Sequence, residues 1–194
     1  RPGALPVPEA AELARVLPLV EALVAENVLV SVDTRKPGVM RAVLAAGASM
    51  INDVRALRER GAVDIVAASA AAVCLMHMQG DPRTMQAAPR YADVVHDVRD
   101  FLVERALTCE AAGIARNRIV IDPGFGFGKS QAHNLVLLRS LDVLARTGYP
   151  VLAGISRKST IGQITGRDVG DRMAGSVAAA LAAVARGARL VRVH

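Results

Sequence analysis

A regular alternation of short, apolar, β-branched runs with longer helical stretches constrains the fold of this sequence more than any other feature. Six runs are predicted to be strands because each is short, apolar and bounded by turn residues. They cover residues 28–33, 49–53, 72–77, 118–122, 150–154 and 189–193. Amphipathic helices are predicted between them, for example over 92–112 and 171–187, with a further helix opening near Pro37. Fully apolar strands linked by helices indicate a parallel sheet covered by helices.

The polar residues that end these runs favour one parallel architecture over another. An open, doubly wound sheet usually places a glycine-rich phosphate turn after its first strand, and this sequence has none there. Polar residues instead follow or end nearly every predicted strand, namely Asp33, Asn52, His77, Asp122, Ser156 and His194. Such residues share one mouth in a parallel barrel. We therefore predict an α/β fold of the TIM (β/α)₈ barrel type, with residues 1–194 forming one domain.

The number of predicted strands is smaller than a closed barrel requires. A (β/α)₈ barrel has eight strands and about 250 residues, whereas this chain has 194 residues and six predicted strands. It begins with a loop-like segment, Arg1-Pro2-Gly3, and ends at His194 where a strand ends. We expect it to cover roughly strands 3 to 8, with two N-terminal strands and the last helix missing. If the protein is truly truncated in this way, it has two open strand edges, and we expect it to be inactive and poorly folded.

Composition and charge exclude several classes of protein. Hydrophobic residues make up 52% of the chain and charged residues 22%, which is typical of a globular domain. Neither a membrane-spanning run nor a signal segment is evident, so we expect a cytoplasmic protein without a membrane partner. The net charge of +6 comes from scattered basic residues with few aromatics, which argues against nucleic acid and allows an anionic small substrate. Cys74 and Cys109 lack metal-ligand spacing and are expected to be buried thiols.

The segment Asp122-Pro-Gly-Phe-Gly-Phe-Gly-Lys129 is the strongest candidate for a binding loop. Its alternating glycines let the backbone approach a ligand closely. Phe125 and Phe127 are costly in a loop unless they cover a flat group or pack below it. The carboxylate of Asp122 can accept two parallel N–H bonds from an amino-pyrimidinone edge, although capping a helix or pairing with a lysine remains an alternative. Lys129 is expected to be a solvated side chain without a catalytic role.

Further polar residues are predicted to face the same mouth. Asp33 and Asn52 end successive strands, and the amide of Asn52 can both donate to and accept from a ring nitrogen beside an amino group. The alternative for each is a local turn held by its side chain. His77 is more ambiguous and fits a structural histidine at least as well as a site residue, while Met76 is expected to line the pocket floor.

Two C-terminal segments suggest binding of anions. Residues 154–160 follow the fifth predicted strand and open a short helix, where Ser159 and Lys158 could meet a carboxylate; a plain capped helix is the alternative. Arg192 and His194 lie two residues apart, which would place them on the same face of the last strand. An arginine in an apolar barrel needs an acid or an aromatic plane as partner, and with His194 it could hold a diphosphate. The alternative is a salt bridge at the strand end to an acid in the missing helix.

Seven motifs in a fixed order resemble the dihydropteroate synthases of the bacterial folate pathway, a pterin-binding family. They are Arg1–Ala4, Ser31–Thr34, Ile51–Asp53, Leu75–Gly80, Asp122–Gly128, Ser156–Ser159 and Arg192–His194. The resemblance covers the whole chain. It implies condensation of 6-hydroxymethyl-7,8-dihydropterin diphosphate with p-aminobenzoate to give 7,8-dihydropteroate and diphosphate. It further implies sensitivity to sulfonamides as p-aminobenzoate mimics, a Mg²⁺ cofactor, and a homodimer for which the helix around 173–185 offers an interface.

The resemblance also implies roles for individual residues. The expected catalytic residues are Asp33, Asp122, Lys158 and Arg192. The expected pterin ligands are Asp33, Asn52, Met76, Asp122, Phe127, Gly154, Lys158 and Arg192. The expected p-aminobenzoate ligands are Arg1, Pro2, Phe127, Lys158 and Ser159. The expected diphosphate ligands are Arg1, Arg192 and His194. No metal ligand is assigned, because the asparagine that binds magnesium in this family belongs to the missing N-terminal part.

Three alternatives differ from this interpretation. A methyltetrahydrofolate:corrinoid methyltransferase shares the pterin pocket but needs no p-aminobenzoate or diphosphate site, so Ser156–Ser159 and Arg192–His194 argue against it. A phosphate-binding aldolase or isomerase would require a Schiff-base lysine or a catalytic acid within a strand, and none of the six predicted strands contains a lysine. A barrel fragment without catalytic activity that serves as a binding or assembly module is the third alternative.

Overall fold

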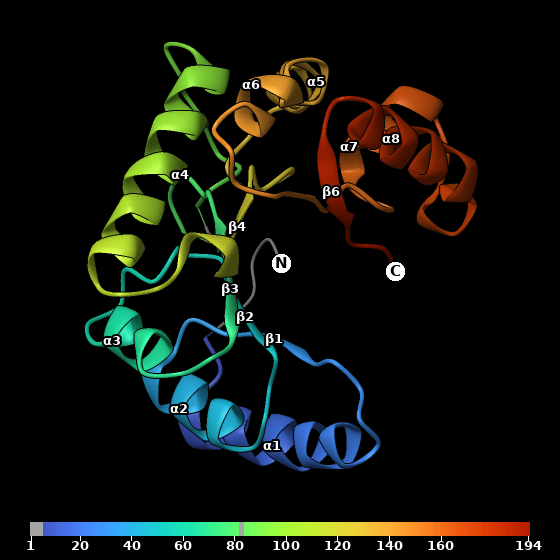
Figure 1. Cartoon of the computed structure of the whole chain (residues 1–194). Helices are drawn as coiled ribbons and strands as arrows, with labels where there is room; N and C mark the ends of the chain where they lie inside the picture. Colours follow the sequence, from blue (N-terminus) through green and yellow to red (C-terminus); the bar gives the residue numbers. More distant parts are fainter. Residues whose placement is uncertain (1–5, 82–83) are drawn as a thin grey trace. The chain divides into compact units, whose positions relative to one another are not determined.

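The computed structural model describes residues 6–81 and 84–194, and these residues form an α/β fold (Figure 1). They divide into two compact units. The first unit comprises residues 6–76 and 104–120, and the second comprises residues 77–103, apart from 82 and 83, with 121–194. In both units the paired strands are parallel and alternate with helices, which confirms the predicted class.

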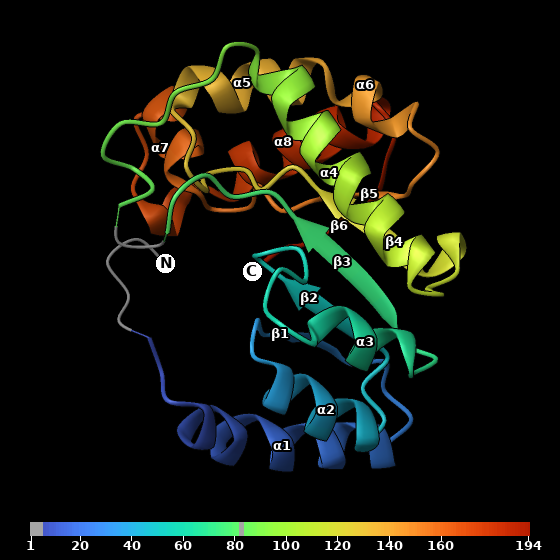
Figure 2. The ribbon, with the colours of Figure 1, turned by 90° about the vertical axis from the view of Figure 1, so that its left-hand side faces the viewer.

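The first unit contains three parallel strands in chain order, together with three complete α-helices. Its complete elements are α1 (Glu9–Ala25), β1 (Ser31–Asp33), α2 (Pro37–Ala45), β2 (Met50–Asp53), α3 (Ala62–Ala67), β3 (Ala72–Met76) and the 3-10 helix η1 (Arg116–Arg118). Figure 2 shows α1, α2 and α3 side by side along these strands. The apolar side chains of these strands form part of the core: Ile51, Val73 and Leu75 are completely buried.

The second unit contains the pairing of β5 with β4 and with β6. Its complete elements are α5 (Gln131–Arg139), α6 (Leu141–Ala145), β5 (Val151–Ala153), α7 (Ser159–Thr165), η2 (Val169–Asp171), α8 (Met173–Ala185) and β6 (Ala188–Val191). Two further elements, α4 (Val94–Ala111) and β4 (Ile119–Asp122), continue from one unit into the other along the chain.

The predicted elements agree with the observed ones in position, and the differences lie at their ends. Pro37 is the first residue of α2, as predicted, because proline fits the first helical turn. The last strand is shorter than predicted and ends at Val191, so Arg192 and His194 lie beyond it and do not share a strand face. The reason is the length of its neighbour: β5 ends at Ala153, whose carbonyl accepts the Arg192 N–H at 3.1 Å as the final bond.

Two sequence-based exclusions can be compared with this fold. Within the described residues, no helix combines the length and apolar character that crossing a membrane requires. Cys74 and Cys109 are both buried thiols, as predicted. Burial raises the pKa of the Cys109 thiol to about 11, which makes it a poor nucleophile near neutral pH.

A buried carboxylate organises the turn that follows β2. Asp53 is completely buried, and its two oxygens accept the N–H groups of Arg55 and Leu57, each at 2.8 Å. Ala56 and Leu57 have φ angles of 53° and 54°, which are unfavourable for residues with a side chain. The Arg105 guanidinium donates to the carbonyls of both. These contacts hold a strained turn directly after Asn52.

We expect Asp53→Ala to lower the free energy of unfolding by about 2–4 kcal/mol, because the N–H groups of Arg55 and Leu57 lose their acceptor in a strained turn. Burial raises the pKa of Asp53 to about 6, so the folded state holds this proton more tightly than the unfolded chain. The titration therefore contributes stability that is complete below about pH 4 and is lost as the pH rises through about 6. Urea unfolding from pH 4 to 7.5 measures both effects.

The exposed residue Asp64, in the first turn of α3, provides the control for this prediction. Asp64→Ala should change the unfolding free energy by less than about 0.5 kcal/mol, because its side chain is solvated. Equal unfolding midpoints for Asp53→Ala and Asp64→Ala at pH 7.5 would contradict a stabilising role of Asp53.

Candidate active site

The carboxylate of Asp122 is the buried centre of the polar cluster in the second unit. Asp122 ends β4 and is only 1% exposed. One of its oxygens accepts the N–H of Gly124 at 2.7 Å, and the other accepts Nη2 of Arg192 at 3.1 Å. The predicted alternative of a lysine partner is therefore replaced by an arginine. Since a carboxylate has about four acceptor positions, Asp122 keeps capacity for further donors.

The guanidinium of Arg192 fits over a position where a side chain is missing. A Cβ atom at Gly154 would lie 2.9 Å from Nη2 of Arg192 and 3.2 Å from its Nε. Gly154 therefore makes room for the arginine that pairs with Asp122. Nearby, Oγ of the buried Ser156 accepts the backbone N–H of His194 at 3.4 Å, and the His194 residue is exposed.

The glycine loop, residues 123–128, has an unusual backbone that only glycine adopts easily. Gly124, Gly126 and Gly128 have φ angles of 67°, 78° and 63°. The two phenylalanines differ in surroundings: Phe125 is buried below the loop, whereas Phe127 is partly exposed. Of the two functions considered for them, packing below the loop applies to Phe125, and only Phe127 is accessible to a flat ligand.

Lys158 is placed between the glycine loop and the Asp122–Arg192 pair. Its Nζ donates to the carbonyl of Phe125 and lies 4.8 Å from the centroid of the Phe127 ring, within cation–π range. Burial lowers the pKa of Lys158 to about 8; Asp122 opposes this shift, and Arg192 adds to it. The second unit thus brings together Asp122, Phe127, Lys158 and Arg192.

The prediction that Lys129 is solvated is wrong. Its side chain is only 2% exposed, and Nζ lies 2.9 Å from Nδ1 of His77, 3.1 Å from the carbonyl of Phe127 and 3.2 Å from that of Gly124. Burial lowers the pKa of Lys129 to about 7, with Asp122 opposing the shift and Lys158 adding to it. The side chain folds back under the loop because carbonyl groups there replace water.

His77 has the surroundings of a structural histidine, the first of its two predicted interpretations. It is buried, and its N–H donates to the carbonyl of Asp122 at 3.0 Å. Its ring contacts Phe101 edge-on at a centroid distance of 5.0 Å and Tyr91 at 6.0 Å. The histidine therefore ties the chain after β3 to the end of β4.

The first unit contains its own pair of predicted site residues. Asp33 and Asn52 are register partners in β1 and β2, and Nδ2 of Asn52 donates to Oδ2 of Asp33 at 3.0 Å. Asn52 is buried, whereas Asp33 is exposed. The hydrogen bond to Asp33 therefore orients the amide of Asn52. The end of β3 contributes Met76, which is completely buried, so the structure offers its sulfur no exposed surface.

The remaining predicted site residues are Arg1, Pro2 and Ser159. Arg1 and Pro2 lie outside the described residues. Ser159 is the first residue of α7 and is exposed. Among residues 6–81 and 84–194, no group of three or more His, Cys, Asp or Glu side chains is arranged to hold a metal ion.

Sequence reasoning missed the residues that support the glycine loop from outside it. Asn134, in α5, accepts the Gly126 N–H at 2.8 Å and donates to Oγ1 of Thr160 at 3.1 Å. Tyr91 donates its hydroxyl to the carbonyl of Gly128 at 2.7 Å. The sequence indicated such residues only indirectly. A loop with three glycines has little conformational preference of its own, so it needs hydrogen bonds from other segments of the chain to hold it.

Comparison with known proteins gives consistent relatives. Residues 1–194 match the family described as pterin binding enzyme. The chain is 52% identical over 198 residues to the dihydropteroate synthase of Neisseria meningitidis serogroup C, covering 100% of the chain and 70% of that relative. It is 57% identical, with a TM-score of 0.94, to the Xanthomonas albilineans dihydropteroate synthase solved with 4-aminobenzoic acid, covering 100% and 70% of the two chains. The Yersinia pestis dihydropteroate synthase solved with a sulfonamide drug complex is 48% identical, with a TM-score of 0.96 and coverages of 100% and 71%.

Proposed function

The chain belongs to the pterin-binding enzyme family, and from this membership we infer that it acts as a dihydropteroate synthase. It transfers the pterin-methyl group of 6-hydroxymethyl-7,8-dihydropterin diphosphate to p-aminobenzoate, which gives 7,8-dihydropteroate and diphosphate in folate biosynthesis. The observation that carries this conclusion is the match of the entire chain to enzymes of this one activity. Sulfonamides are accordingly expected to compete with p-aminobenzoate.

We assign recognition of the pterin to carboxylates and an amide. Asp122 has acceptor capacity left beside Gly124 and Arg192, so it is suited to two parallel N–H groups on the amino-pyrimidinone edge. We also assign Asp33 and Asn52 to the pterin, because their mutual hydrogen bond fixes which donors and acceptors Asn52 presents. Gly154 keeps its proposed place in the lining of the pocket, because it makes room for Arg192. Met76 is completely buried, so its assignment to the pocket rests on the resemblance alone.

The proposed reaction proceeds by loss of diphosphate. The bond between the methylene carbon and the diphosphate oxygen breaks, and its electron pair leaves with the diphosphate. Arg192 and His194, with Arg1 as implied by the resemblance, would neutralise the negative charge that develops on the leaving group. The remaining methylene cation is conjugated with the pterin, where the negative charges of Asp33 and Asp122 stabilise it. The arylamine nitrogen then attacks the carbon and releases a proton, so no protein nucleophile is needed.

We assign the p-aminobenzoate to the accessible side of the glycine loop. Phe127 offers a partly exposed ring, and the ammonium of Lys158 lies over that ring. The exposed hydroxyl of Ser159 is suited to the carboxylate of p-aminobenzoate. Pro2 and Arg1 retain the p-aminobenzoate roles that the resemblance implies.

Magnesium remains a proposal that rests on the chemistry of diphosphate. A divalent cation would supply charge neutralisation for the leaving group. Among the described residues no group of three or more His, Cys, Asp or Glu side chains could hold a metal ion, so we name no ligand for it. We therefore derive no step through the metal.

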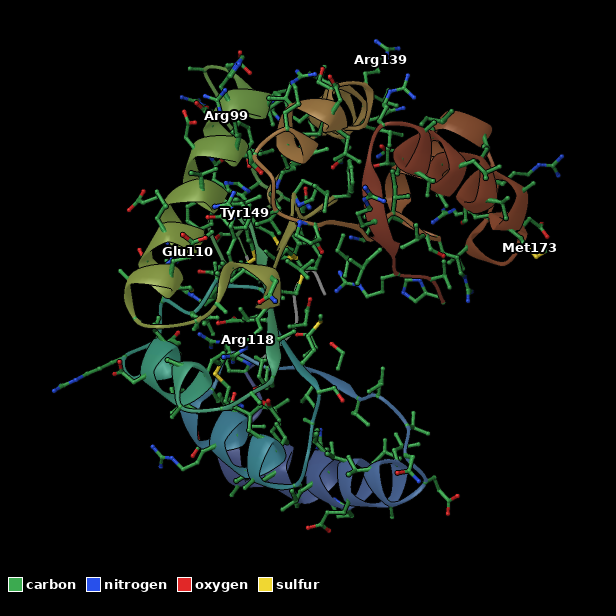
Figure 3. All side chains as sticks on the ribbon, viewed as in Figure 1. Arg99, Glu110, Arg118, Arg139, Tyr149 and Met173 are labelled. Atoms are coloured by element: carbon green, nitrogen blue, oxygen red, sulfur yellow. The ribbon has the colours of Figure 1, made fainter. Side chains whose placement is uncertain are left out.

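Assembly, compartment and barrel numbering are also proposals. A homodimer is supported by exposed apolar side chains on α8, namely Met173, Val177, Leu181 and Val184. Figure 3 labels the first of these, Met173, which is 77% exposed. An apolar hollow of about 600 Å³ borders the same helix. The assignment of the six strands to positions 3 to 8 of a (β/α)₈ barrel is supported by the order of the family's motifs alone. The cytoplasm is proposed because the relatives are enzymes of folate biosynthesis.

Isothermal titration calorimetry tests the proposed function. We expect p-aminobenzoate to bind when Mg²⁺ and diphosphate or the pterin diphosphate are present, and to bind at least about tenfold more weakly without them, because the leaving group supplies part of the second site. A sulfonamide should compete with p-aminobenzoate, and benzoate should not bind comparably. Absence of dihydropteroate formation by the complete, folded protein, with all substrates and Mg²⁺ supplied, would contradict the proposal.

A further inference from the structure

The contacts of Lys129 match the hydrogen-bonding capacity of an ammonium group. Such a group has three N–H donors and no acceptor. Nζ has Nδ1 of His77 at 2.9 Å and the carbonyls of Phe127 and Gly124 at 3.1 and 3.2 Å, with the His77 carbonyl more distant at 3.4 Å. All of these partners are acceptors when His77 carries its ring proton on Nε2. The buried amine therefore joins the segment after β3 to the glycine loop.

Other contacts fasten the same two segments together. The Tyr91 hydroxyl donates to the carbonyl of Gly128 at 2.7 Å, and the Gln86 side-chain amide donates to the carbonyl of Gly126. A Cβ atom at Gly128 would overlap the carbonyl oxygen of Gln79, so the two backbones touch there. Of the side chains of Lys129, Tyr91 and Gln86, that of Lys129 lies beneath the loop and can carry a positive charge.

The loop held in this way contacts Asp122 and Lys158 and contains Phe127, three of the groups that we assign to the substrates in the second unit. Its Gly124 N–H donates to Asp122, and its Phe125 carbonyl accepts from Lys158. Its Phe127 ring forms the surface over which Lys158 lies. A shift of this loop would therefore move Asp122, Lys158 and Phe127 at the same time. Displacements of about 1 Å in such groups cost about 100-fold in rate.

We propose that Lys129 and His77 are positioning residues, which hold the glycine loop in the geometry that Asp122, Phe127 and Lys158 require for the transfer reaction. The inference rests on the proposed function and adds two residues to it. Neither residue needs to touch a substrate, because the amine points to backbone carbonyls and to an imidazole nitrogen below the loop. Its effect on catalysis is exerted through the carbonyls of Gly124 and Phe127.

The test compares Lys129→Ala with a variant that loses a similar contact elsewhere. Arg118, labelled in Figure 3, donates to the carbonyls of Ala71 at 2.6 and 2.9 Å and of Val66 at 3.1 Å in the first unit. Arg118→Met therefore also removes a cation from backbone carbonyls, and it leaves the glycine loop untouched. Both variants should lower the melting temperature. Only Lys129→Ala should lower kcat/KM for the pterin diphosphate, by about 30-fold or more, at temperatures well below melting.

Rescue by a small amine separates positioning from general stability. Propylammonium has the length and the three donors of the deleted side chain. At about 50 mM it should raise the kcat/KM of Lys129→Ala at least about fivefold. Propan-1-ol, which has a single donor, should restore none. Rescue of activity without a matching rise in melting temperature supports positioning of the loop.

Several outcomes would overturn the inference. They are an unchanged pterin kcat/KM in Lys129→Ala, an equal loss in Arg118→Met, or no rescue by propylammonium. If Lys129→Ala does not fold, Tyr91→Phe removes only the hydroxyl bond to Gly128 and should lower kcat/KM by about threefold; no change there would also overturn it. A wild-type protein without turnover contradicts the proposed function, whereas normal turnover in both wild type and Lys129→Ala contradicts only the role of Lys129.

Discussion

We expect Asp122→Asn to lower kcat/KM for the pterin diphosphate by about 100-fold or more, equivalent to about 3 kcal/mol of transition-state stabilisation. Asparagine keeps the shape and one oxygen that can accept the Gly124 N–H. It cannot accept two parallel N–H bonds from the pterin, and its amide would direct N–H groups toward the Arg192 guanidinium. The substitution also removes a negative charge that would stabilise the methylene cation. Steady-state kinetics of diphosphate release measures the effect.

Asp142→Asn is the matched control, because Asp142 also pairs with an arginine but lies on α6 and is 46% exposed. Surface ion pairs contribute about 0–1 kcal/mol, so this variant should retain kcat/KM within about twofold. Pterin affinity should be measured in parallel, since loss of anchoring raises Kd and loss of cation stabilisation lowers kcat. An Asp122→Asn enzyme within about threefold of wild type in both parameters would exclude Asp122 as the pterin anchor.

We expect the activity of the wild-type protein to fall with a slope of about tenfold per pH unit above about pH 8. Burial lowers the pKa of Lys158 from 10.5 to about 8, so the folded protein loses this proton at a pH where the unfolded chain keeps it. The neutral amine can no longer balance an anionic substrate. Lys158→Arg should remove this alkaline decline, because a guanidinium stays charged, and Lys158→Met should be about 100-fold less active without that decline.

The pH profile also distinguishes Lys158 from its buried neighbour. Burial lowers the pKa of Lys129 to about 7, and a decline caused by Lys129 would persist in Lys158→Arg. If the alkaline decline of kcat/KM is the same in wild type and Lys158→Arg, Lys158 is not the group whose charge the reaction needs. Melting temperatures over the same pH range serve as the control for unfolding.

Much of the secondary structure could be predicted because its signals are local. Apolar runs bounded by turn residues located all six strands, and proline at position 37 marked the start of α2. The ends were less predictable, since a strand stops where its neighbour stops. The last strand shows this: β5 ends at Ala153, so Arg192 makes the final ladder bond and His194 lies beyond it.

The sequence by itself determined which residues we propose for the chemistry: the carboxylate of Asp122, the glycine loop, and the cations Lys158 and Arg192. These are properties of residue type, order and spacing, and they sufficed to indicate the family. Only the tertiary structure decided how the cations are used. Arg192 pairs with Asp122 across 70 residues of sequence, and Lys129 leaves solvent to meet His77 across 52. A long, flexible side chain takes its partner from whatever the fold brings within reach, and no local pattern encodes that choice.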